Sequence, residues 1–102
     1  MSDTYTITRF WARPGLSQKL AEMNGSLRGY ALWARNMMEA SPGGKHVHDT
    51  YLRDVLKARR PAPLWMVVVL TRIATEEPLM TRDEAVALAG EFFTTTDPRE
   101  AS

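Results

Sequence analysis

The sequence predicts a small, helix-rich α+β domain with the element order β-α-α-β-α. Its 102 residues are the size of one ordinary domain. Two segments are rich in the β-branched and aromatic residues that favour strands, and three others carry apolar residues at helical spacing. We therefore expect a single domain over residues 1–98, followed by a mobile C-terminal tail over residues 99–102.

The first predicted strand runs from Thr4 to Trp11. It consists almost entirely of Thr, Tyr, Ile, Phe and Trp, which fit a pleated surface. Pro14-Gly15 follows and predicts a turn. We expect the face that carries Tyr5, Ile7 and Trp11 to lie against the core.

The strongest pattern is an apolar repeat, at alternating steps of four and three residues, that predicts one long helix from Leu16 to Ala40. Ala31 and Met38 widen its stripe, as a core-facing helix requires. Asn24-Gly25-Ser26 leaves a break open, since Ser26 could cap a second helix, but the phase continues through Gly25 and favours one helix. The positions of the repeat are Leu16, Leu20, Met23, Leu27, Tyr30, Ala34, Met37 and Ser41.

Three further elements follow. A helix from about Val47 to Arg59 has apolar residues on one face, and Pro61-Ala62-Pro63 ends it. Leu64 to Ile73 is apolar on both faces, which predicts a strand covered on both sides. Thr81 and Glu84 have the spacing of a capping box, which predicts a last helix that runs to about Phe93. Because an isolated two-stranded sheet is marginally stable, we expect it to be covered by helices or extended by a second copy of the chain.

The composition excludes several classes of protein. The chain has no Cys, so it has no disulfide, no thiolate metal site and no Cys nucleophile. The longest apolar run, Leu64 to Leu70, is far too short to span a membrane, and residues 1–12 show no signal peptide. We therefore expect a cytoplasmic protein with no membrane partner.

The charges are unevenly distributed along the chain. Residues 1–73 carry eleven basic and five acidic side chains, whereas residues 74–102 carry two basic and seven acidic ones. The excess of positive charge in residues 1–73 can attract an acidic partner. The simpler interpretation is that the acidic part faces the basic part of the same fold or of a second copy.

Aromatic and Met side chains gather in the second half of the long helical pattern, and they are the best candidates for a protein interface. Trp33 lies off the main stripe, one step around the helix from Tyr30 and Met37. Aromatic residues and Met are enriched in interface cores. The simpler alternative is that Trp33 packs inside its own fold. The interface candidates are Tyr30, Trp33, Met37 and Met38.

Basic side chains on the predicted second helix form a second candidate surface, for nucleic acid or another acidic partner. No helix-turn-helix, RRM or zinc-finger pattern accompanies them, so a solvated helix face is the simpler interpretation. The candidates are Arg53, Lys57, Arg59 and Arg60.

No pattern predicts catalysis or a cofactor. His46 and His48 form the one histidine pair, at a predicted loop-to-helix junction, with Asp49 the only carboxylate close in sequence. The acidic pairs Glu76-Glu77 and Asp83-Glu84 lie where solvated charges are ordinary. We expect no catalytic residues, no metal and no cofactor.

These patterns favour a small non-enzymatic protein-interaction module, with a regulatory or inhibitory role, that forms a homodimer. A nucleic-acid-binding module that uses the basic side of the second helix is the alternative. A small-ligand-binding or enzymatic domain with a pocket between helix and sheet is the third hypothesis.

Overall fold

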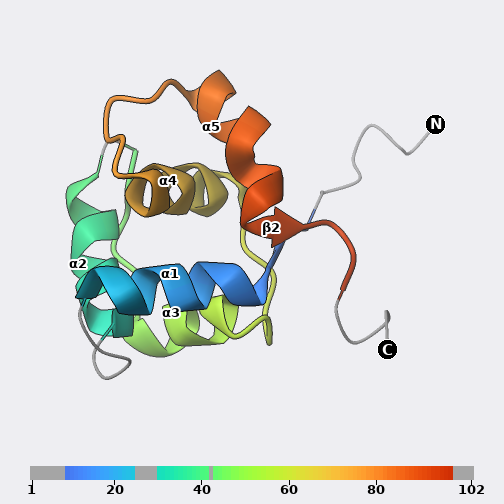
Figure 1. The fold of residues 1–102 in the computed structure, drawn as a ribbon. Helices are drawn as coiled ribbons and strands as arrows, with labels where there is room; N and C mark the ends of the chain where they lie inside the picture. Colours follow the sequence, from blue (N-terminus) through green and yellow to red (C-terminus); the bar gives the residue numbers. More distant parts are fainter. Residues whose placement is uncertain (1–8, 25–29, 42, 98–102) are drawn as a thin grey trace.

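The computed structural model describes residues 9–24, 30–41 and 43–97 of the chain. Over these residues the chain is a small α+β domain with five α-helices and a two-stranded antiparallel sheet (Figure 1). The elements in chain order are β1 (Trp11–Ala12), α1 (Pro14–Asn24), α2 (Tyr30–Ala40), α3 (Asp49–Leu56), α4 (Leu64–Thr75), α5 (Arg82–Leu88), the short 3-10 helix η2 (Ala89–Glu91) and β2 (Phe93–Thr94).

The segment predicted as the second strand, Leu64 to Ile73, is the central helix α4, so that prediction is wrong. Of its twelve residues, eight are buried: Met66, Val67, Val68, Val69, Leu70, Thr71, Ile73 and Ala74. α4 contacts α1, α2 and α5. α3 packs instead against α1, α2 and β1.

A helix that is buried on nearly all sides is apolar all round, and periodicity alone does not distinguish it from a covered strand. The length was the better signal, because an apolar-rich segment of twelve residues exceeds the usual four to eight residues of a strand. Val and Ile lower helix propensity by only a few tenths of a kcal/mol each. Burial of the same side chains stabilises the helix by about 1.5–3 kcal/mol apiece, which outweighs that preference.

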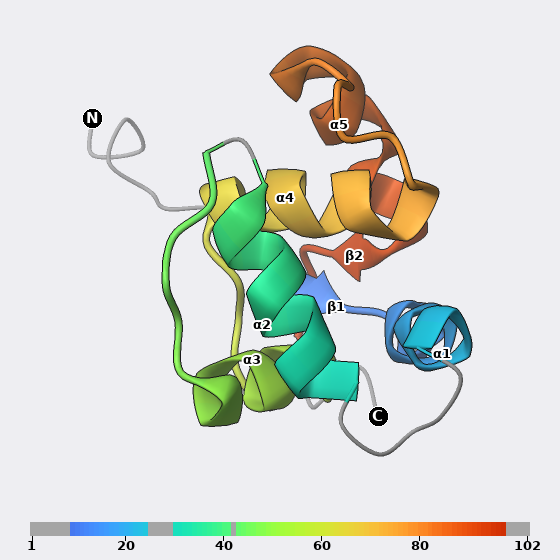
Figure 2. The same ribbon diagram turned by 90° about the vertical axis from the view of Figure 1, so that its left-hand side faces the viewer.

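The stretch from Leu16 to Ala40 forms two helices rather than one. Figure 2 shows α1 nearly end-on while α2 runs obliquely across the view, so the two do not continue one straight axis. Gly25 and Ser26, where the sequence left a break open but favoured one continuous helix, lie outside the described residues. Each helix buries its own pair of apolar residues at i, i+4: Leu16 and Leu20 on α1, Ala34 and Met38 on α2.

The buried face of α2 differs from the predicted one by a single position. Met38 is fully buried, whereas Met37, which the repeat placed in the stripe, is 42% exposed. The apolar repeat predicts the buried residues of α2 correctly only if α1 and α2 form one unbroken helix. Because the chain changes direction between them, α2 sets its own phase.

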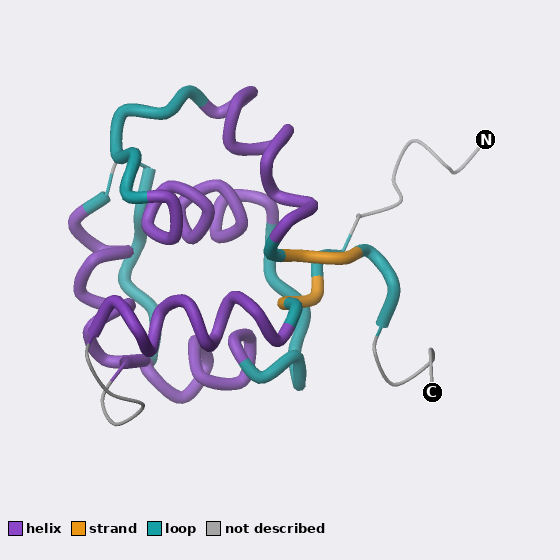
Figure 3. Tube along the Cα trace, viewed as in Figure 1, coloured by secondary structure: helices purple, strands orange, loops and turns teal. Residues whose placement is uncertain are grey.

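The sheet is a short ribbon that joins the two ends of the described chain (Figure 3). Trp11 pairs with Thr94 and Ala12 with Phe93, and the Arg13 guanidinium Nε donates to the carbonyl oxygens of Gly90 and Phe93 at 2.9 and 3.2 Å. The predicted first strand is thus present at Trp11, but its partner is residues 93–94 and not residues 64–73. Thr4 to Thr8 and the tail 99–102 lie outside the described residues.

The two remaining helices confirm their predictions within shorter bounds. α3 occupies Asp49–Leu56 and buries Leu52, Val55 and Leu56. α5 begins with the predicted capping box, in which the Glu84 amide donates to the Thr81 hydroxyl and the Thr81 amide donates to the Glu84 carboxylate. Within the described ranges, no helix is long and apolar enough to cross a membrane.

Candidate protein-interaction site

Two of the four predicted interface residues, Trp33 and Met37, line the same surface cavity. It has a volume of about 260 Å³ and lies where α1, α2 and the end of α4 meet. Trp33 is half-buried and packs against the core, while Met37 is 42% exposed. We call this the Trp33 cavity; its lining residues are Met23, Trp33, Met37, Ser41, Arg72, Ile73, Glu76 and Pro78.

Of the other two predicted interface residues, Met38 does not contribute to this surface. Met38 is 0% exposed and belongs to the core, so it is withdrawn as an interface candidate. Its burial follows from the phase of α2, which turns position 38 inward together with Ala34. The side chain of Tyr30 lies outside the described part of the structure.

The walls of the Trp33 cavity are mainly apolar, and its edge is polar. Met23, Ile73 and Pro78 join Trp33 and Met37 in the wall. At the edge, the Ser41 hydroxyl donates to the Met37 carbonyl at 2.7 Å, which closes the end of α2. Arg72 and Glu76 add one positive and one negative side chain.

Glu76 occupies a position that favours a different residue. α4 ends in a Schellman motif, in which the Glu77 amide donates to the Arg72 carbonyl and the Glu76 amide to the Ile73 carbonyl. Glu76 takes the left-handed position, with φ 58°, where Gly is the usual residue. Its negative charge also opposes the helix dipole at a C-terminus. Neither property stabilises the fold.

Sequence reasoning missed the contribution of α4 to this cavity because the segment was assigned to a strand. Arg72, Ile73 and Glu76 lie at i, i+1 and i+4, which places them on neighbouring faces of a helix end but on both faces of a strand. A helical assignment of residues 64–75 would have brought Glu76 to the same edge as Arg72.

The four basic candidates lie on and just after α3, and two of them contact groups within the chain. The Arg53 guanidinium lies 3.4 Å from the Asp49 carboxylate, and the Arg60 guanidinium lies 4.7 Å from the centre of the Tyr51 ring. Lys57 and Arg59 are exposed. Exposed ion pairs such as Arg53–Asp49 contribute little to stability, so this side of α3 is a solvated basic surface.

The histidine pair lies on an exposed loop. His46 Nδ1 lies 3.3 Å from the Glu39 carboxylate, and the rings of His46 and His48 are 6.4 Å apart. Over the residues that the structure describes, no group of three or more His, Asp or Glu side chains is placed to hold a metal ion.

Comparison of the chain with protein-family models, with curated proteins and with solved structures finds no match.

Proposed function

We propose that this chain is a non-enzymatic protein-interaction module that binds its partner through the Trp33 cavity. The observation that carries the proposal is that Trp33 and Met37 line the same 260 Å³ cavity. Both were predicted as interface residues from their residue types. Interface anchors are typically aromatic or Met side chains next to a pocket that excludes water. The volume suits one large apolar side chain of a partner, and the Arg72 and Glu76 edge suits its polar neighbours.

The position of Glu76 supports the same proposal. Its left-handed backbone and its charge both oppose folding. Residues whose backbone conformation is unfavourable for folding are concentrated at functional sites. A carboxylate at the edge of an apolar cavity would select a partner segment that carries a basic residue beside its apolar anchor.

The test compares wild-type protein with Met37→Glu, and with Val86→Glu as a matched control. Val86 is also 42% exposed, but it lies on α5 and outside the Trp33 cavity. Each protein is immobilised and exposed to an extract of its native host, and the affinity of any captured protein is then measured. We expect a partner that binds wild type and Val86→Glu, and that binds Met37→Glu at least about tenfold more weakly. A partner that binds all three equally well would contradict the proposal.

Glu76→Gly separates binding from folding. Gly relieves the left-handed position, so we expect the free energy of unfolding to rise by about 0.5–1 kcal/mol. The same variant loses the carboxylate at the cavity edge, so we expect its affinity for the partner to fall. A gain in stability with unchanged affinity would remove Glu76 from the site.

A second copy of the chain is the first partner to examine, because we expect self-association as a homodimer. Sedimentation of the wild type and of Met37→Glu measures it directly. A dimer that Met37→Glu converts to a monomer places the contact at the Trp33 cavity. A wild-type monomer at micromolar concentration would refute self-association, though not a different protein partner.

Nucleic acid is the alternative partner, because the exposed Lys57 and Arg59 are available to phosphates. That hypothesis predicts binding to mixed DNA or RNA that falls steeply as salt is raised. Charge reversal at Arg53 and Lys57 would abolish such binding and leave the Met37-dependent partner bound. No shift of either nucleic acid at low salt would remove the alternative.

A further inference from the structure

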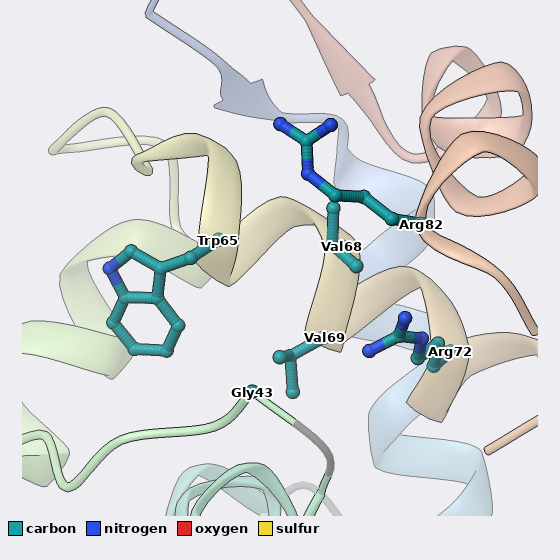
Figure 4. A pocket seen from close by; sticks show the side chains of 6 residues that line it. All are labelled: Gly43, Trp65, Val68, Val69, Arg72 and Arg82. Carbon is teal, nitrogen blue, oxygen red and sulfur yellow. The ribbon is translucent and has the colours of Figure 1, made fainter. Parts of the chain in front are cut away.

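A second cavity, which shares Arg72 with the Trp33 cavity, lies along α4 between the loop after α2 and the start of α5. It has a volume of about 270 Å³ and is lined by Gly43, Trp65, Val68, Val69, Arg72 and Arg82 (Figure 4). Trp65, Val68, Val69 and Arg72 lie at i, i+3, i+4 and i+7, which places them on one face of α4. We call this the Trp65 cavity.

The apolar part of this cavity is formed by Trp65, Val68 and Val69. The two valines are almost completely covered, with 5% and 1% of their surface exposed, and they form the floor of the cavity on the central helix. The Trp65 indole is half-buried and lies to one side of them. An aromatic or branched apolar group bound here would leave water and pack against these three side chains.

The charged side chains among the described lining residues of the Trp65 cavity are all cationic. Arg72 and Arg82 contribute two guanidinium groups, and no lining residue is acidic. The Arg72 Nε donates to the Met80 carbonyl at 2.8 Å, which holds the guanidinium at the wall. Figure 4 shows the Arg72 guanidinium and the Trp65 indole on opposite sides of Val69. The Lys45 ammonium, 5.5 Å from the centre of the Trp65 ring, adds a third positive charge.

We propose that the Trp65 cavity binds a small amphipathic anion, namely a monocarboxylate that carries one aromatic ring. An apolar floor with a few cationic groups at its edge is the usual form of a site for such a ligand. Guanidinium groups bind carboxylates in preference to neutral amides, because the bond is charge-assisted. An apolar cavity of about 150 Å³ holds a benzene molecule, so this one holds the ring and a short carboxylate arm.

The probe for the test is phenylacetate, with phenylacetamide and inorganic phosphate as its two controls. Each is added to ¹⁵N-labelled full-length protein, and the amide and indole resonances are followed by NMR. We expect phenylacetate to shift the Trp65 indole N–H and the Val68 and Val69 amides, with an apparent Kd of about 1 mM or tighter. Phenylacetamide lacks the negative charge and phosphate lacks the aromatic ring, so each should bind several-fold more weakly at these three residues.

Variants then identify the contribution of the cations. Arg82→Gln should raise the Kd for phenylacetate about two- to fivefold, the range of an exposed ion pair. Arg59→Gln removes an exposed charge that does not line the cavity and should leave the Kd unchanged.

Three outcomes would overturn the proposal. The first is the absence of any shift at Trp65, Val68 and Val69 at millimolar phenylacetate. The second is equal binding of phenylacetamide, which would show an apolar hollow without anion recognition. The third is equal binding of phosphate, which would show a cationic surface without a site for the ring.

Discussion

At the scale of single residues, the clearest local conflict in the core is Thr71. It is 0% exposed on the central helix, and its hydroxyl oxygen has no hydrogen-bond partner among the described residues. A buried hydroxyl without a partner costs about 1–3 kcal/mol. The neighbouring Thr75 differs, because its hydroxyl donates to the Thr71 carbonyl at 2.8 Å.

Thr71→Val should therefore stabilise the protein, since Val keeps the branched shape and removes the unpaired hydroxyl. We expect the free energy of unfolding, measured in urea, to rise by about 1 kcal/mol. Thr75→Val is the matched control and should lower it by about 1 kcal/mol, because a hydrogen bond is lost. A loss of stability in Thr71→Val would show that its hydroxyl is satisfied, for example by a buried water molecule.

At the scale of elements, α5 depends on the capping box at its N-terminus. Hydrogen bonds from the Thr81 amide and hydroxyl hold the pKa of the Glu84 carboxyl below its ordinary value of 4.5. A carboxyl whose pKa is lowered by folding stabilises the folded state fully above its unfolded pKa. That contribution is lost as the pH falls through the lowered folded pKa.

Thr81→Ala should lower the free energy of unfolding by about 1 kcal/mol at neutral pH, as expected for loss of an N-cap. The difference from wild type should shrink as the pH falls below 4.5, because the hydrogen bond from the Thr81 hydroxyl to the Glu84 carboxylate weakens once the carboxylate is protonated. Thr81→Ser keeps the hydroxyl and should retain most of the wild-type stability and its pH dependence. A Thr81→Ala difference that stays constant down to pH 2 would contradict this account.

The elements also show how far the sequence predicts the fold. The α3 and α5 helices and the Thr81 cap follow from local patterns, and they were predicted within a few residues. The strand at residues 64–73 was wrong because burial on all sides hides the helical period. The β2 strand was missed because its two residues pair with a segment about eighty positions away, and no local pattern records such a contact. Of the residues that line the Trp33 cavity, the sequence singled out only Trp33 and Met37 on α2, because the segment that forms α4 was assigned to a strand.

At the scale of the whole molecule, the core is centred on α4. It packs against α1, α2 and α5, and most of its residues are buried. α5, by contrast, buries only Ala85 within its seven residues and exposes Val86 and Ala87. We therefore expect α5 to open locally at a lower free energy than α4.

Native-state hydrogen exchange measures this difference residue by residue. The amides of Val69 to Ile73 should exchange only when the whole molecule unfolds. The amides in the last turn of α5 should exchange through local opening, several-fold faster or more. Equal protection of α4 and α5 would show that the described domain opens as a single unit.

The Trp11–Thr94 ribbon also determines how the domain responds to a pulling force. The segments before Trp11 and after Thr94 leave the antiparallel pair at the same end. Tension between them would first act on the bridge between Phe10 and Ala62. It would then load the ribbon's hydrogen bonds one after another, as in the opening of a zipper, and would not shear them together. The Arg13 side chain, bonded to the carbonyls of Gly90 and Phe93, would be the last link of that zipper. When the domain is pulled by its two ends, we expect the ribbon to open at low force while α4 remains packed against its neighbouring helices.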